Sequence, residues 1–157
     1  MASLQKITPF LWFDGKAEQA AHFYASIFPG SKVTSITRYP EGSPMPAGTA
    51  MVASFELCGQ PFAGMNAGPG YPFTWAVSFV VHCEGQAEID HYWAALQAGG
   101  GSPSQCGWLQ DQFGLAWQIM PANMGTLMSN ASGPTAARRM AAMLRMTKII
   151  IADLEAA

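Results

Sequence analysis

The chain has 157 residues, enough for one domain or for two small halves that share a core, and too few for two independent domains. Half of its residues are hydrophobic and only 11% are charged, which excludes a disordered or fibrous chain. The net charge is −2 and the basic residues are scattered apart from Arg138 and Arg139, so no nucleic-acid partner is expected. So few surface charges favour a subunit interface or an enclosed ligand cavity.

The sequence also predicts a compartment. The longest apolar runs, such as residues 77–81, fall far short of the roughly 20 residues that a membrane crossing needs, so no membrane partner is expected. Gln5 and Lys6 lead directly into a strand-like segment, which predicts no secretory signal. The three cysteines are odd in number and widely spaced, so neither a disulfide framework nor a paired-cysteine zinc site is expected. We therefore expect a cytoplasmic protein with reduced thiols.

The first half of the chain reads as a strand, a helix and three strands. Residues 7–13 are rich in β-branched and aromatic residues and predict a strand. Apolar residues at helical spacing predict a helix over about residues 16–28, which Pro29-Gly30 stops. Turn-rich segments separate the three further predicted strands, at residues 32–39, 49–57 and 61–66.

The second half repeats this order, and residues 14–25 align with residues 84–94 after one deletion. The predicted elements are a strand at 75–83, a helix at about 86–98, a short strand near Gln105-Cys106, and a hairpin with strands at 108–112 and 115–120.

From residue 123 onward the pattern is helical. Pro134 suits a first helical turn, and a second short helix is predicted near residues 151–157, although residues 149–151 could instead pair as an edge strand. Such an apolar extension must pack on its own body or on a partner subunit. Its apolar stripe consists of Ala137, Met140, Met143 and Leu144.

Two tandem β-α-β-β-β modules resemble the vicinal oxygen chelate superfamily, which includes glyoxalase I, ring-cleaving dioxygenases and the bleomycin- and fosfomycin-resistance proteins. Within it the chain is most similar to the PhnB-like group, also labelled 3-demethylubiquinone-9 3-methyltransferase-like. The motifs that carry the resemblance are ITPFLWFDG at 7–15, HFY at 22–24, IFP at 27–29, FELCGQPF at 55–62, SFVV at 78–81, QCGWL at 105–109 and WQIMP at 117–121.

This resemblance implies an α+β fold in which two modules form a glyoxalase/bleomycin-resistance-type half-barrel with a C-terminal helical extension. A single domain over residues 1–157 would contain one module at about 5–70, the other at about 73–122 and the helical tail at about 123–157. The half-barrel encloses a cleft that dimerisation usually completes. A homodimer is therefore the expected assembly.

The resemblance also implies where a metal would bind. In the metal-dependent members, the first and last strands of each module supply ligands drawn from His, Glu and Gln. The corresponding places here are residues 7–9, 65–66 and 75–78, which offer no such ligand, and Gln118, the one recognisable candidate. A single amide oxygen does not hold a divalent ion against water, so no metal site is expected.

No cofactor is expected either, although the group's label names a methyl transfer. A loop that binds such a cofactor places its glycines at the start of a helix. The glycines at 99–101 follow a helix and those at 64–70 join two strands. Neither stretch predicts an adenosylmethionine site.

The histidines and Cys106 are expected to have structural rather than reactive roles. His22 and His91 are expected on the outer flanks of the two helices and His82 at a strand end. Cys106 fits a buried thiol that packs against Trp108 better than a nucleophile, because no base or helix N-terminus lies near it in the sequence.

The favoured function is a metal-free homodimer that binds and sequesters an apolar or amphipathic small molecule in an aromatic cleft. The alternatives are a superfamily enzyme that uses a metal held through Gln118 for isomerisation or oxygenation, and a methyltransferase as the label says. Aromatic rings and neutral hydrogen-bonding groups suit such a ligand, whereas the alternative for each residue is a place in the packed core. The candidate ligand-binding residues are Trp12, Asn66, Trp75, Ser78, Cys106, Trp108 and Gln118.

Overall fold

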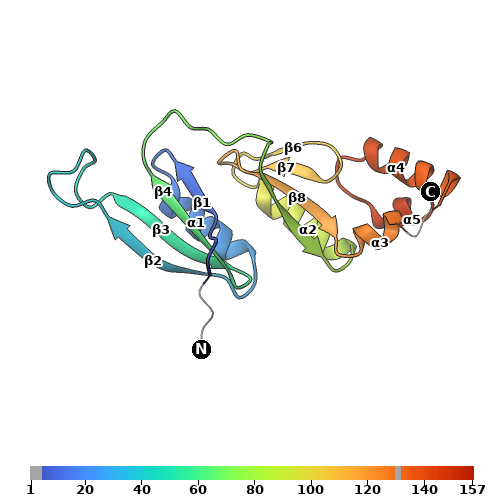
Figure 1. The fold of residues 1–157 in the computed structure, drawn as a ribbon, viewed down its shortest axis with the longest axis horizontal. Coiled ribbons are helices and arrows are strands. Elements are labelled where there is room, and N and C mark those ends of the chain that lie inside the picture. Colours follow the sequence, from blue (N-terminus) through green and yellow to red (C-terminus); the bar gives the residue numbers. More distant parts are fainter. Residues whose placement is uncertain (1–4, 130–131) are drawn as a thin grey trace. The chain divides into compact units, whose positions relative to one another are not determined.

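The internal repeat of the sequence corresponds to two separate sheets. The computed structural model describes residues 5–129 and 132–157. Its chain divides into two compact units, Met1–Pro72 and Phe73–Ala157, and each contains a four-stranded mixed sheet (Figure 1). The predicted α+β fold with two βαβββ modules and C-terminal helices is confirmed.

The sheet of the first unit has the strand order β1-β4-β3-β2. β1 runs parallel to β4, and the two remaining pairs are antiparallel. Because β1 and β4 are parallel neighbours, the C-terminal ends of both strands lie at the end of the sheet where the helix begins. The elements are β1 (Phe10–Phe13), α1 (Ala17–Ile27), β2 (Lys32–Arg38), β3 (Ala50–Leu57) and β4 (Gln60–Asn66).

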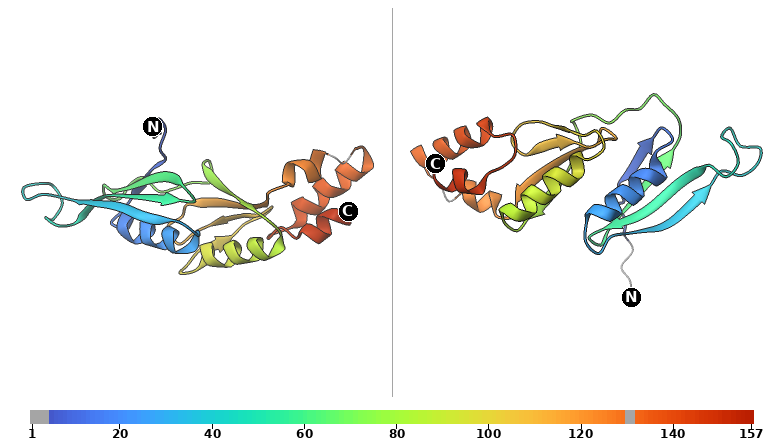
Figure 2. Two further views of the ribbon diagram at one scale, coloured as in Figure 1. Left: turned by 90° about the horizontal axis from the view of Figure 1, so that it is seen from below. Right: turned by 180° about the vertical axis from the view of Figure 1, so that it is seen from behind.

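Helix α1 covers one face of this sheet (Figure 2). Ala17, Ala20, Ala21 and Tyr24 of this helix are completely buried, which lets the helix approach the strands closely. The approach is tightest at Gly64 of β4, where an added Cβ would lie 2.9 Å from the ring of Phe13 and 3.6 Å from Ala17. Because side chains alternate along a strand, Trp12 and Met65 lie on the opposite, open face.

The second unit repeats this topology with the strand order β5-β8-β7-β6. β5 is parallel to β8, as β1 is to β4. Its helix covers the sheet face that holds Leu109, Trp117 and Ile119, all of them buried. The elements are β5 (Ser78–Cys83), α2 (Gln86–Gln97), β6 (Ser102–Pro103), β7 (Trp108–Gln110) and β8 (Ala116–Pro121).

Three helices follow: α3 (Met124–Ser129), α4 (Pro134–Arg145) and α5 (Ile151–Glu155). The segment around α5 packs on the second unit, because Ile149 and Leu154 are completely buried. Of the two alternatives for the end of the chain, the structure has the helix, which begins at Ile151. None of the helices in the described part of the chain has the length and apolar character that a bilayer crossing requires.

The apolar stripe of the tail does not pack as a whole. Met140 and Leu144 of α4 are 45% and 57% exposed, and Ala137 beside them is exposed as well. The half-buried side of α4 instead includes Met143 and Arg139, whose guanidinium donates a 2.6 Å hydrogen bond to the Leu127 carbonyl of α3. Contact with α3 therefore turns much of the apolar stripe outward.

One predicted strand is wrongly placed, and two were predicted to begin too early. The short strand expected near Gln105-Cys106 lies at Ser102–Pro103, and residues 104–107 form a turn instead. Cys106 and Gly107 have φ values of 57° and 80°, which lie outside the β region that a regular strand requires. β1 begins at Phe10 and β5 at Ser78, so residues 7–9 and 75–77 precede their strands.

Candidate functional site

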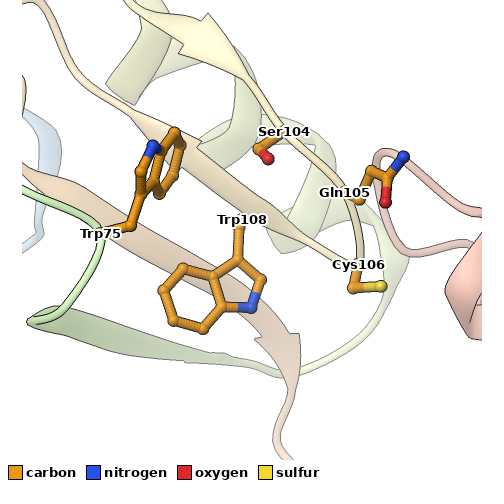
Figure 3. Close-up of a pocket in the computed structure, with 5 residues that line it drawn as sticks. All are labelled: Trp75, Ser104, Gln105, Cys106 and Trp108. Carbon is orange, nitrogen blue, oxygen red and sulfur yellow. The ribbon is translucent and has the colours of Figure 1, made fainter.

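A cavity of about 350 Å³ opens on the second unit. Two indole rings stand beside it, and a turn supplies its remaining wall (Figure 3). This volume lies within the range of small-molecule sites. The residues that line the cavity are Trp75, Ser104, Gln105, Cys106 and Trp108.

The two tryptophans come from different parts of the unit. Trp108 lies on β7, and its neighbour Leu109 is buried on the opposite face of the sheet, so alternation directs Trp108 to the open face. Trp75 precedes β5 and is 43% exposed. Their ring centroids are 6.4 Å apart at an interplanar angle of 60°. The rings therefore form an apolar corner with one side open to solvent.

The turn that completes the wall has an unusual backbone. Cys106 has a positive φ of 57° without being glycine, and Gly107 follows at 80°. A Cβ at position 107 would lie 2.8 Å from the Ile119 carbonyl oxygen, so glycine is required there. Across the turn, the Ser104 amide donates to the Trp108 carbonyl at 2.8 Å. This closure places Ser104 and Cys106 at the cavity.

Polar groups continue on the open face of the same sheet. Gln118 of β8 is paired in register with Trp108 on one side and Val80 on the other. Its side-chain amide donates a 2.9 Å hydrogen bond to the Ser78 hydroxyl. Five candidate residues from the sequence thus belong to this unit, and Ser78, Trp108 and Gln118 share one sheet face. Their role in ligand binding remains a prediction.

The other two candidates, Trp12 and Asn66, belong to the first unit and have local partners there. The indole N–H of Trp12 donates to the Gly68 carbonyl at 2.8 Å, and its ring meets Tyr71 edge-on at 4.9 Å. Asn66 is 2% exposed and lies on the helix-facing side of β4. Its Oδ1 atom accepts from the Ala17 amide at 2.8 Å. The structure thus gives Asn66 the role of a buried helix cap.

The open face of these strands does not supply a metal centre. The first and last strands of the two modules present Trp12, Met65, Ser78 and Gln118 there, with His82 exposed near the end of β5. The imidazole of His82 and the amide of Gln118 lie two residues out of register with each other. Two such groups are too few ligands for a divalent ion. Among residues 5–129 and 132–157, no three His, Cys, Asp or Glu side chains come together as a metal site. The residues present do not fit the chelate centre that the family resemblance implies.

The three thiols differ in their surroundings. Cys58 is exposed, Cys106 is half-buried in the wall of the cavity, and Cys83 is buried at the end of β5. Burial, with a smaller contribution from the Glu88 carboxylate, raises the pKa of the Cys83 thiol to about 11. The thiolate is the reactive form, so Cys83 is an inert core residue.

Three residues of this unit were not predicted as functional. Ser104 and Gln105 line the cavity, and their one signal in the sequence was the adjoining Cys106-Gly107 pair. Asp111 is 3% exposed and accepts hydrogen bonds from the Phe113 and Leu115 amides and from the Trp117 indole at 2.9–3.1 Å. An aspartate that precedes a Phe-Gly turn is a typical turn-closing residue. It secures the hairpin that joins β7 to β8.

The architecture defines the class of protein. Two βαβββ modules with these strand orders are modules of the glyoxalase/bleomycin-resistance type. A fosfomycin resistance protein, FosX from Mesorhizobium loti, matches with a TM-score of 0.56 over 82% of this chain and 98% of its own. At 10% identity, this similarity shows the fold alone.

Sequence comparison then gives the family. Residues 5–120 match the family model of 3-demethylubiquinone-9 3-methyltransferase, and the chain belongs to this family. The PhnB protein of Bacillus cereus is 39% identical, with a TM-score of 0.67, over 75% of this chain and 100% of its own. PA1353 of Pseudomonas aeruginosa is 26% identical, with a TM-score of 0.60, over 74% and 96%. No curated protein matches the chain. Helices α3 to α5 lie beyond the residues that the family model matches.

Proposed function

We propose that this PhnB-like protein binds and sequesters an uncharged, partly apolar small molecule at the cavity of the second unit, without a metal ion. The observation that carries the proposal is the indole corner of Trp75 and Trp108 beside the neutral side chains of Ser104 and Gln105. Aromatic faces supply contact area, and a few polar groups fix the orientation of a ligand.

The absence of charge in the lining sets the class of ligand. Hydroxyl and amide groups both donate and accept hydrogen bonds, so they suit an alcohol, phenol or carbonyl compound. An anion would find no Lys or Arg among the five residues that line the cavity. Gln118 and Ser78 extend the neutral polar surface along the open face of the sheet.

Two enzymatic functions are the alternatives. A metal-assisted reaction would need ligands besides Gln118, and the open faces of the described strands do not offer a sufficient set. The name of the family favours methyl transfer, which would need a site for a methyl donor. These alternatives predict, respectively, activity that a divalent ion restores after chelation and saturable binding of S-adenosylmethionine.

We further propose that the protein is a homodimer and that α4 contributes to its interface. Met140 and Leu144 form an exposed apolar face, flanked by the exposed Arg138 and Arg145. Four of the eight basic residues lie between Arg138 and Lys148, whereas eight of the ten acidic residues precede residue 112. A second copy therefore supplies charges opposite to those of α4. The three free thiols fit a reducing compartment such as the cytoplasm.

Calorimetric titration with 2-naphthol tests the proposed binding site, because this neutral probe joins an aromatic body to a single hydroxyl. We expect saturable binding that chelation with EDTA leaves unchanged and that Trp108→Ala abolishes. The matched control is Trp93→Ala on α2, outside the cavity lining. Binding by the Trp108→Ala protein as tight as that by the unmodified chain would contradict the proposed site.

A further inference from the structure

We propose that the C-terminal segment 146–151 positions the wall of this cavity, so that ligand binding depends on a part of the chain beyond the matched family region. The inference rests on the proposed function, because it concerns the same cavity. The residue that anchors the segment is Gln86 of α2, which we assign as a positioning residue.

Backbone hydrogen bonds join the segment to the turn. The Cys106 amide donates to the Met146 carbonyl and the Gly107 amide to the Thr147 carbonyl, both at 2.8 Å. On its other side, the turn is joined to the sheet by the Ile119 amide, which donates to the Gly107 carbonyl at 2.8 Å. The turn is thus held between β8 and the tail, and two consecutive amides depend on the tail for their partners.

Gln86 holds the tail in place. Its side-chain amide donates to the Ile149 carbonyl at 3.0 Å, and its Oε1 atom accepts from the Ile151 amide at 2.9 Å. The side chain of Gln86 therefore makes one donated and one accepted hydrogen bond with the backbone of the tail, as a neighbouring strand would. One turn further along α2, Asp90 forms a 2.6 Å ion pair with Lys148. The complete burial of Ile149 adds an apolar anchor.

The backbone of the turn explains why this support matters. Cys106 holds a left-handed φ of 57°, a conformation that a residue with a Cβ adopts at a cost and keeps when its surroundings enforce it. At Gly107, the tail is close enough that an added Cβ would lie 2.9 Å from the Cγ1 atom of Ile149. Without the tail carbonyls, Cys106 is expected to relax and to carry Gln105 and its own thiol away from the cavity.

The test compares Gln86→Ala with Gln97→Ala in the full chain. Both remove a glutamine side chain from α2, but Gln97 donates to the Trp93 carbonyl within the helix. The first readout is hydrogen exchange of the Cys106 and Gly107 amides, measured by NMR. The second is calorimetric binding of 2-naphthol. Lys148→Gln, which removes an ion pair at the surface, serves as a milder variant if Gln86→Ala does not fold.

We expect Gln86→Ala to accelerate exchange at both amides and to weaken 2-naphthol binding, each by about tenfold, while Gln97→Ala changes neither. Unchanged exchange, or accelerated exchange with unchanged binding, would overturn the inference. If the unmodified chain does not bind 2-naphthol, this result contradicts the proposed function. The exchange rates then still decide whether the tail holds the turn, and unchanged rates would refute it.

Discussion

Asn66 at the end of β4 accepts a 2.8 Å hydrogen bond from the backbone amide of Ala17 at the start of α1. The same side chain donates to the Ala50 carbonyl of β3 at 3.0 Å. A single buried amide thus joins the first turn of the helix to two strands. Lys16, at the N-cap position, makes no side-chain capping bond, so the cap comes from Asn66, which lies 49 positions beyond Ala17.

Replacing Asn66 by alanine is expected to lower the free energy of unfolding by about 2 kcal/mol, because a cap is lost and a buried carbonyl loses its donor. Urea unfolding followed by circular dichroism measures the change. Gln19→Ala, at an exposed position on the same helix, is the control and should be nearly neutral. Equal stability of the Asn66→Ala and Gln19→Ala proteins would disprove the capping role.

Asp111→Asn is expected to destabilise the second unit by about 3 kcal/mol, because the carboxylate accepts three N–H groups in a buried place and an amide accepts fewer. One of the three donors is the Trp117 indole, at 2.9 Å. Chemical unfolding gives the stability, and the indole N–H signal of Trp117 should move in the NMR spectrum. A signal that keeps its position would argue against this bond.

Cys83 should resist thiol reagents in the folded protein. At pH 9, about one in a hundred of these thiols is ionised if its pKa is about 11, and burial hinders access. Because folding raises this pKa, the stability that the protonated thiol contributes is present below the ordinary thiol pKa and is lost as the pH rises towards 11. Titration with dithiobis(nitrobenzoate) should show rapid reaction at Cys58 and none at Cys83 until urea is added. Three thiols that react equally fast would contradict this prediction.

A charge on the exposed face of α4 should weaken self-association. Leu144→Glu places a carboxylate in the proposed interface, where its desolvation opposes contact. Sedimentation velocity at micromolar concentration should show a dimer for the unmodified chain and a larger share of monomer for the variant. The control, Gln19→Glu, adds a carboxylate to an exposed place on α1 and should leave the dimer intact. A monomeric unmodified chain would contradict the dimer proposal.

Periodicity predicted the fold because both helices pack on their sheets through regular apolar faces. The helices expected at residues 16–28 and 86–98 are observed at Ala17–Ile27 and Gln86–Gln97. The tail was harder to predict, because its apolar stripe could pack either on its own body or on a partner subunit. Arg139 instead contacts α3 and leaves Leu144 exposed.

The site was predictable in part. Trp75, Cys106 and Trp108 were expected from their residue types, and the structure brings them together around one cavity. The turn that does so depends on carbonyls of residues 146 and 147, which lie about forty positions away, so local sequence does not reveal it. The buried position of Asn66 could have been predicted from the alternation of side chains along the strand, since Asn66 and Gly64 both lie on the face that meets α1.

The most direct test of metal-free binding at the second unit is the set of indole N–H signals from the five tryptophans, recorded while 2-naphthol is added in the presence of EDTA. Saturable shifts at Trp75 and Trp108, with Trp12, Trp93 and Trp117 little changed, are the predicted result. No saturable shift at Trp75 and Trp108, or a shift that appears only after a divalent ion is added, would contradict the account.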